Sequence, residues 1–209
     1  MIIDSLTHVT PDGRWFDTAY DASESRLLRE MDSAGVERAV VVALAGYISN
    51  EYVLDACARN GSRWLAGASF DPAAYPTPEH AAREFRAQLH GAPFQVLKLH
   101  PRLNHYDPLD IRCLAVLDEL SSWKQPLPVW LDTLFYFSGG QLQRPPLDSI
   151  HHLVCRFPGI VFVLLHGTGA SMLSLAETVR DCPNAFVDLS LTLCRYARTS
   201  VMSDIGFLM

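Results

Sequence analysis

The stretch Phe-Gln-Val-Leu-Lys-Leu-His-Pro, residues 94–101, decides the fold, because it is an apolar run that ends in two titratable side chains. Successive side chains of a strand point to opposite faces, so Lys98 and His100 are predicted to share one face while Leu97 and Leu99 share the other. Pro101 cannot donate a hydrogen bond to a neighbouring strand and stops the pairing there. The sequence therefore predicts a buried strand with a lysine and a histidine at its C-terminal end.

Other stretches repeat this pattern of an apolar run followed by a polar side chain. Residues 160–166 end in His166, which Gly-Thr-Gly follows, and residues 127–132 end in Asp132. Seven strands are predicted in all, with a helical pattern after each of the first six. They are residues 1–4, 38–44, 64–70, 94–101, 127–132, 160–166 and 185–189. Such alternation, with His, Lys or Asp at the strand ends, predicts a TIM-type (β/α) barrel with its site at those ends.

The length of 209 residues limits how complete this barrel can be. One domain, residues 1–209, is expected, although a complete barrel usually takes about 250 residues and about 200 only with minimal loops. After Ser190 no eighth strand is recognisable, so we expect an incomplete barrel whose C-terminal strand and helix are missing. No Gly-x-Gly-x-x-Gly follows the first strand, which disfavours dinucleotide binding.

Composition excludes several functional classes. A net charge of -6, from 17 Lys and Arg against 23 Asp and Glu, argues against a nucleic-acid surface and favours a small-molecule substrate. No apolar stretch approaches the roughly 20 residues of a membrane helix, and the N-terminus lacks a signal-peptide pattern, so a cytoplasmic protein that binds no membrane is expected. The edge strands of an unclosed sheet have unpaired backbone groups that can pair with a second copy of the chain, so a homo-oligomer is one expectation.

The cysteines and the surface histidines carry weaker signals. The five cysteines are odd in number and show no Cys-x-x-Cys spacing, so they are expected to be reduced and mostly buried. His151 and His152 are neighbours on a predicted helix, where adjacent residues face different directions and make a poor chelate.

Five motifs together resemble the amidohydrolase superfamily, in particular its group of aminocarboxymuconate-semialdehyde decarboxylase-like enzymes and pyrone-dicarboxylate lactonases. The motifs are Ile2-Ile3-Asp4-x-x-x-His8, Lys98-Leu99-His100-Pro101, Pro128-Val129, Leu165-His166-Gly167-x-Gly169, and Asn-Ala-Phe-Val-Asp-Leu-Ser at residues 184–190. The resemblance covers residues 2–190. It implies a metal-dependent hydrolase or decarboxylase that acts on a small organic acid or lactone, with zinc or manganese as the metal.

The sequence departs from the family's pattern at three places. The first histidine of the family's His-x-His motif is Leu6 here, the metal-binding histidine of strand five is replaced by Asp132, and the aspartate of strand eight has no counterpart. A catalytic zinc takes about three protein ligands and an open water position. His8, Asp132 and His166 are the ligands that the resemblance then implies, since carboxylates also bind zinc and manganese.

The predicted catalytic residues are Lys98, His100 and His166, which would handle protons or the substrate's carboxylate. Each also has a structural interpretation: a histidine after an apolar strand is often a hydrogen-bonded loop residue, and Lys98 and His100 can form structural ion pairs. Asp132 needs a cationic or metal partner if it is buried. In a metal-free variant of the site, Lys98, His100 and His166 would polarise the carbonyl.

Two further hypotheses remain open from the sequence. Four aromatic side chains in two loops are predicted to wall a substrate pocket, or to serve only in packing: Trp15, Phe16, Tyr136 and Phe137. The alternative function is that of a non-catalytic or truncated relative that binds a ligand or a partner, which Leu6 and the missing eighth strand favour.

Overall fold

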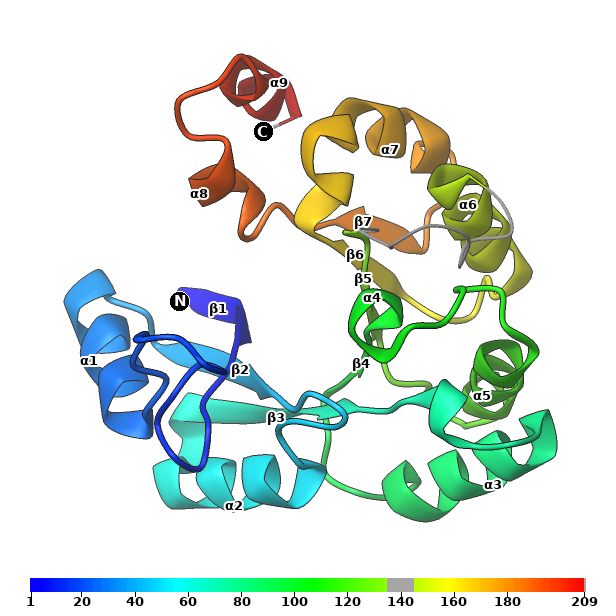
Figure 1. The fold of residues 1–209 in the computed structure, drawn as a ribbon, viewed down its shortest axis with the longest axis horizontal. Coiled ribbons are helices and arrows are strands. Elements are labelled where there is room, and N and C mark those ends of the chain that lie inside the picture. Colours follow the sequence, from blue (N-terminus) through cyan, green and yellow to red (C-terminus); the bar gives the residue numbers. More distant parts are fainter. Residues whose placement is uncertain (135–144, 209) are drawn as a thin grey trace. The chain divides into compact units, whose positions relative to one another are not determined.

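The computed structural model of this chain describes residues 1–134 and 145–208 (Figure 1). These residues group into two compact units. The first unit comprises Met1–Phe70 and Gly91–Lys98, and the second comprises Asp71–His90 and Leu99–Met209. Each unit is described by itself. Whether residues 1–209 form one domain stays a prediction.

The first unit is built on parallel strands paired in sequence order. They are β1 (Ile3–Thr7), β2 (Arg38–Val42), β3 (Trp64–Ser69) and β4 (Val96–Leu99), with Asp4 opposite Ala39, Ala39 opposite Trp64, and Gly67 opposite Val96. Apolar residues on both faces of β2 are buried, which is typical of a parallel strand covered on both sides. A Cβ on Gly67 would approach methyl groups of Val42 and Val96 to 2.9 Å, so only glycine fits there.

The helices of the first unit begin at side-chain caps. Ser23 caps α1 (Glu24–Ala34), and Ser49 caps α2 (Asn50–Asn60), which packs along β3 (Figure 1). Asn50 is used otherwise: its side chain donates to the Ser69 carbonyl at 3.0 Å and accepts from the Ser69 N–H at 2.9 Å. This amide therefore fixes the C-terminal end of β3. A short 3₁₀ helix, η1 (Gly61–Arg63), links α2 to β3.

The second unit contains the remaining parallel strands, also paired in sequence order. They are β5 (Val129–Asp132), β6 (Phe162–Leu165) and β7 (Ala185–Val187). Its longer helices are α3 (Pro78–Leu89), α5 (Ile111–Ser121), α6 (Pro146–Arg156) and α7 (Met172–Val179). Shorter segments are η2 (Pro72–Ala74), α4 (Pro101–Asn104), η3 (His166–Ser171), α8 (Thr192–Arg195) and α9 (Val201–Leu208). Phe85 of α3 stacks on Trp123 after α5, with ring centroids 5.2 Å apart, and this contact joins the two helices.

The seven predicted strands are confirmed, with small changes at their ends. The first strand is Ile3–Thr7 rather than residues 1–4, because its pairing with β2 begins at Ile3. β4 ends at Leu99, so the predicted alternation does not reach His100, which instead caps α4. Among the described residues after β7 there are two helices and no eighth strand.

Asp110 caps α5, so Ile111 is the first helical residue and is 67% exposed. One other expectation is wrong. The cysteines are free but not mostly buried: Cys113 is buried, Cys57 and Cys182 are partly exposed, and Cys155 and Cys194 are exposed. Cys155 lies on the solvent-facing side of helix α6.

In the part of the chain that is described, no helix has both the length and the apolar character to cross a membrane.

Candidate active site

Asp132, the last residue of β5, is fully buried and is surrounded by nitrogen atoms of the second unit. Its Oδ2 atom lies 3.3 Å from His100 Nε2, 3.5 Å from His166 Nε2 and 3.3 Å from Arg102 Nη2. Its Oδ1 atom accepts from the Leu134 N–H at 3.1 Å. We call Asp132, His100, Arg102 and His166 the Asp132 centre.

The charge of Asp132 follows from these neighbours. Burial alone would raise the pKa of its carboxyl group, but the hydrogen bond with His166 and the charges of His100 and Arg102 outweigh burial. They hold the pKa of Asp132 well below its usual range, so this carboxyl group is ionised at neutral pH. The predicted need for a cationic partner is thus met by the protein itself.

Helix α4 supplies two members of the centre. His100 Nδ1 accepts a hydrogen bond from the Leu103 N–H at 3.3 Å, so in the neutral ring the proton is on Nε2, which donates toward Asp132. Arg102 lies in the first turn of the same helix, and its side chain is 34% exposed. Sequence analysis missed Arg102; its position directly after Pro101, at the end of an apolar strand, was the available signal.

His166 is oriented from the end of β7. Its Nδ1 lies 2.9 Å from the Ser190 carbonyl oxygen and 3.1 Å from Ser190 Oγ, so Nδ1 carries a proton. Nε2 donates to Asp132 when the ring is charged and presents a lone pair to it when the ring is neutral. Asp188 Oδ1 accepts from the N–H groups of Ser190, at 3.0 Å, and of His166, at 3.5 Å. Ser190 Oγ also bonds to Asp188. Asp188 and Ser190 therefore position the ring.

The chain turns sharply after His166, because several residues there have positive φ. Gly167 has φ 53°, Thr168 has φ 56° and Gly169 has φ 67°. A Cβ on Gly167 would also approach Leu189 to 2.9 Å, so this position needs glycine for space as well as for conformation. The Gly-Thr-Gly sequence thus lets the backbone leave β6 without displacing the His166 ring.

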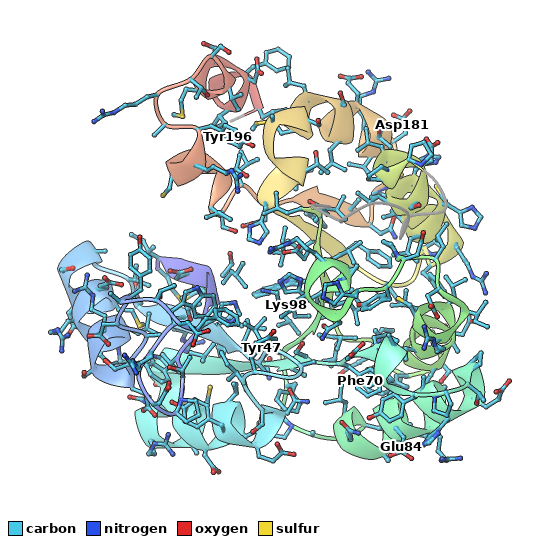
Figure 2. The ribbon with its side chains drawn as sticks, in the orientation of Figure 1. Tyr47, Phe70, Glu84, Lys98, Asp181 and Tyr196 are labelled. Atoms are coloured by element: carbon cyan, nitrogen blue, oxygen red, sulfur yellow. The ribbon has the colours of Figure 1, made fainter. Side chains whose placement is uncertain are left out.

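In the first unit, His8 and Lys98 form a second polar pair at strand ends. His8 Nδ1 lies 2.7 Å from the Val42 carbonyl oxygen and donates to it, which leaves Nε2 as an acceptor. Lys98 Nζ, on a side chain that is 2% exposed, donates to this Nε2 at 3.2 Å. Trp15 stacks on the His8 ring with centroids 5.3 Å apart. Figure 2 labels Lys98.

A cavity of about 420 Å³ lies in the first unit, in the loops that follow β1 and β2. Trp15, Phe16 and Tyr47 contribute to its wall, and their rings are in edge contact in that order (Tyr47 is labelled in Figure 2). Two of the four aromatic residues predicted to wall a pocket therefore line one. The other two, Tyr136 and Phe137, lie outside the described residues.

The predicted site residues divide between the two units. Of the predicted catalytic residues, His100 and His166 belong to the Asp132 centre and Lys98 contacts His8. Of the predicted metal ligands, Asp132 and His166 face each other, and His8 belongs to the first unit. The complete three-ligand set of His8, Asp132 and His166 stays a prediction.

The two facing groups fit a divalent metal in donor type and spacing. When His166 is neutral, its Nε2 and Asp132 Oδ2 face each other as two lone pairs across 3.5 Å, an arrangement in which both atoms could bind one metal ion. Two ligand atoms at about 2.0–2.1 Å from a tetrahedral zinc are about 3.4 Å apart. An imidazole and a carboxylate are also ordinary zinc and manganese ligands.

Parallel strands alternating with helices, with polar side chains at their C-terminal ends, define a TIM-type (β/α)-barrel protein with seven strands in the described residues. The chain belongs to the Amidohydrolase family, whose family model matches residues 3–203. No curated protein matches the chain.

Several solved structures are similar to this chain. An uncharacterized TIM-barrel protein from Bordetella bronchiseptica has a TM-score of 0.74 and 16% identity, over 98% of this chain and 79% of the other. A probable 2-pyrone-4,6-dicarboxylic acid hydrolase from Acinetobacter baumannii, with citric acid bound, has a TM-score of 0.55 and 16% identity, over 91% and 70%. An amidohydrolase from Burkholderia multivorans with bound zinc has a TM-score of 0.56 and 13% identity, over 90% and 69%.

These comparisons confirm the predicted superfamily and the barrel fold. Family membership supports an enzyme of hydrolase type that uses a divalent metal. The likeness to the solved structures, at 13–16% identity, shows the fold alone.

Proposed function

We propose that this protein is a metal-assisted hydrolase that cleaves the lactone or ester bond of a small organic acid at the Asp132 centre. Membership of the Amidohydrolase family supports the reaction type. The structural likeness to a probable 2-pyrone-4,6-dicarboxylic acid hydrolase with citric acid bound supports an acidic substrate. The observation that carries the proposal is the pair of His166 Nε2 and Asp132 Oδ2, which face each other as two ligands of one cation would.

The metal is proposed to be zinc or manganese, held by Asp132 and His166. When bound, such a metal lowers the pKa of a water molecule and polarises a substrate carbonyl. Hydrogen bonds orient both proposed ligands: His166 Nδ1 donates to the Ser190 carbonyl oxygen, and the Leu134 N–H donates to the Asp132 carboxylate.

Arg102 is proposed to bind the carboxylate of the substrate. Its contacts with Asp132, at 3.3 and 3.4 Å, are long for charge-assisted hydrogen bonds, which are about 2.7–2.9 Å. The guanidinium group is therefore loosely held, and its partial exposure lets a substrate reach it. A planar guanidinium also matches a carboxylate with two parallel hydrogen bonds.

His100 is proposed to move the proton at its Nε2 atom. The Leu103 N–H keeps Nδ1 as an acceptor, so Nε2 holds the exchangeable proton against Asp132. Asp132 Oδ2, 3.3 Å away, is the group with which this proton would exchange, so His100 would act as a neutral proton donor. The predicted catalytic role of Lys98 is a separate proposal, tested by Lys98→Met.

The proposal is tested by metal analysis and hydrolysis assays on the same preparations. Protein purified without added metal is analysed by plasma mass spectrometry, and lactones of small carboxylic acids are screened by proton release. His166→Ala and Asp132→Asn are each expected to lose the metal of this centre and to lower kcat/KM by at least about 100-fold. His152→Ala, which removes an exposed histidine of α6, is the matched control and keeps wild-type activity.

Arg102→Lys separates binding from chemistry. The lysine keeps the positive charge but cannot form the bidentate hydrogen bond with a carboxylate. KM for a carboxylate-bearing lactone is therefore expected to rise, while the kinetics with the uncharged parent lactone stay unchanged. Carbon dioxide release without lactone cleavage would replace the hydrolase proposal by a decarboxylase. A protein without metal or turnover would support the alternative, a non-catalytic ligand-binding relative, which Leu6 at the family's first metal histidine favours.

A further inference from the structure

Three potential metal ligands meet on the outside of the second unit. His151, Cys155 and Cys182 each offer one ligand atom, and these three atoms lie within 4.8 Å of one another. Cys155 Sγ is 3.5 Å from His151 Nε2. We call these residues the thiol cluster.

Helix geometry and one partly buried amide bring the thiol cluster together. His151 and Cys155 are four residues apart on α6, so their side chains lie on the same face of the helix. Cys182 follows α7 in a turn, where its N–H donates to the Val179 carbonyl oxygen at 2.9 Å and its own carbonyl accepts from the Ala185 N–H at 3.0 Å. The turn is thereby given a fixed conformation.

The same turn is attached to the end of α6. Asn184 Nδ2 lies 3.2 Å from the carbonyl oxygen of Val154, 3.1 Å from that of Phe157 and 3.0 Å from that of Ile160. This side chain holds the residues after α7 against the C-terminal end of α6, two residues from Cys182. The three ligand atoms are therefore placed by the fold and not by flexible side chains alone.

We propose that His151, Cys155 and Cys182 form a binding site for a thiophilic divalent cation such as zinc. Two thiolates and one imidazole are a donor set that selects zinc over magnesium or calcium. In a tetrahedral zinc site with bonds of about 2.3 Å to sulfur and 2.0–2.1 Å to nitrogen, those two atoms are about 3.6 Å apart. The observed separation of 3.5 Å between Cys155 Sγ and His151 Nε2 fits this geometry, and Cys182 Sγ lies within 4.8 Å of both atoms.

The surroundings suit a bound cation. Asp181, labelled in Figure 2, directly precedes Cys182, and its charge acts on the Cys182 thiol. His151 and Cys155 are exposed, which leaves the fourth coordination position to water.

The thiol cluster differs in chemistry from the Asp132 centre, which has nitrogen and oxygen donors only. A thiolate bound to cobalt(II) gives an intense near-ultraviolet charge-transfer absorption that nitrogen and oxygen ligands do not give. Cobalt therefore reports on the thiol cluster separately, and failure of the proposed hydrolase function would leave this signal unchanged.

The experiment is a titration of chelator-stripped, reduced full-length protein with cobalt(II), followed by displacement with zinc. The wild type is expected to show a thiolate charge-transfer band that rises to a plateau corresponding to one cobalt ion per chain at the thiol cluster. Cys155→Ser or Cys182→Ser abolishes the band, and His151→Ala weakens cobalt affinity by at least about tenfold. Cys194→Ser and His152→Ala, which remove an exposed cysteine and an exposed histidine outside the cluster, leave the titration unchanged.

Two outcomes would overturn the proposal. One is a wild-type protein that shows no thiolate band, whether or not cobalt binds elsewhere. The other is a band that survives in the Cys155→Ser/Cys182→Ser double variant. Circular dichroism of each variant shows that loss of the band does not reflect loss of the fold, and free-thiol counting before the titration shows that the cysteines were reduced.

Discussion

The Asp132 centre and the thiol cluster belong to the same unit but are built in opposite ways. Asp132 has no exposed surface, and main-chain groups of Leu103 and Ser190 fix the rings on either side of it. The thiol cluster lies on the outer face of α6, where His151 and Cys155 are exposed. The Asp132 centre is thus part of the core, and the thiol cluster lies on the surface of the protein.

This difference sets when each site contributes to stability. A buried carboxylate must be compensated as soon as the protein folds, so the partners of Asp132 contribute in the absence of any ligand. Exposed cysteines cost little when no metal is bound, so the thiol cluster stabilises the fold only through a cation that binds the native state. The comparison is tested most directly by removing one group from each site.

Asp132→Asn is expected to have the largest effect. The substitution keeps the shape but removes the charge that His100, Arg102 and His166 contact, and it leaves a buried group poorly paired. Breaking a buried ion pair from one side costs about 3–5 kcal/mol, and urea unfolding of metal-free protein measures it. Cys155→Ser under the same conditions is the matched control. A loss below about 1 kcal/mol would show that the Asp132 centre does not support the fold.

The second prediction concerns acid stability. The pKa of Asp132 is held well below its unfolded value of about 3.9, so its stabilising contribution is complete above that pH and is lost as the pH falls through the folded pKa. Metal-free wild type should therefore lose free energy of unfolding below about pH 4, and Asp132→Asn should lose less over the same range. Urea unfolding at a series of acidic pH values gives the slope of the free energy of unfolding against pH for each of the two proteins.

Asp148→Asn, at the start of α6, is the control for this titration and should keep the wild-type slope. Equal slopes in the wild type and in Asp132→Asn would contradict the prediction, because the titrating carboxyl group would then be a different one. Chelator in every sample keeps bound metal from adding its own pH dependence.

The sequence predicts the parts of the Asp132 centre that depend on strand ends. Asp132 and His166 each follow an apolar run, and parallel strands bring their C-terminal ends to one edge, so local patterns were sufficient. Arg102 was missed because its role depends on α4 beginning directly after β4, and the strand pattern was extended through His100 instead.

The thiol cluster could not be predicted in the same way. His151 was considered only with its neighbour His152, whereas its partner on α6 is Cys155, one helical turn later. Cys182 comes from another element altogether, and its place depends on Asn184 bonding to carbonyl oxygens at the end of α6. Such a contact is tertiary, and no spacing in a single sequence reports it.

The smallest expected effect is that of Cys155→Ser on metal-free protein. An exposed side chain that makes few contacts changes the free energy of unfolding by less than about 0.5 kcal/mol. With zinc at 100 times its dissociation constant, the wild type should gain about 2.7 kcal/mol, and Cys155→Ser should gain nothing from this site. Thermal unfolding with and without zinc measures both quantities, and Cys194→Ser should behave as the wild type. Destabilisation of metal-free Cys155→Ser by as much as Asp132→Asn would break the comparison, because the thiol cluster would then be part of the core.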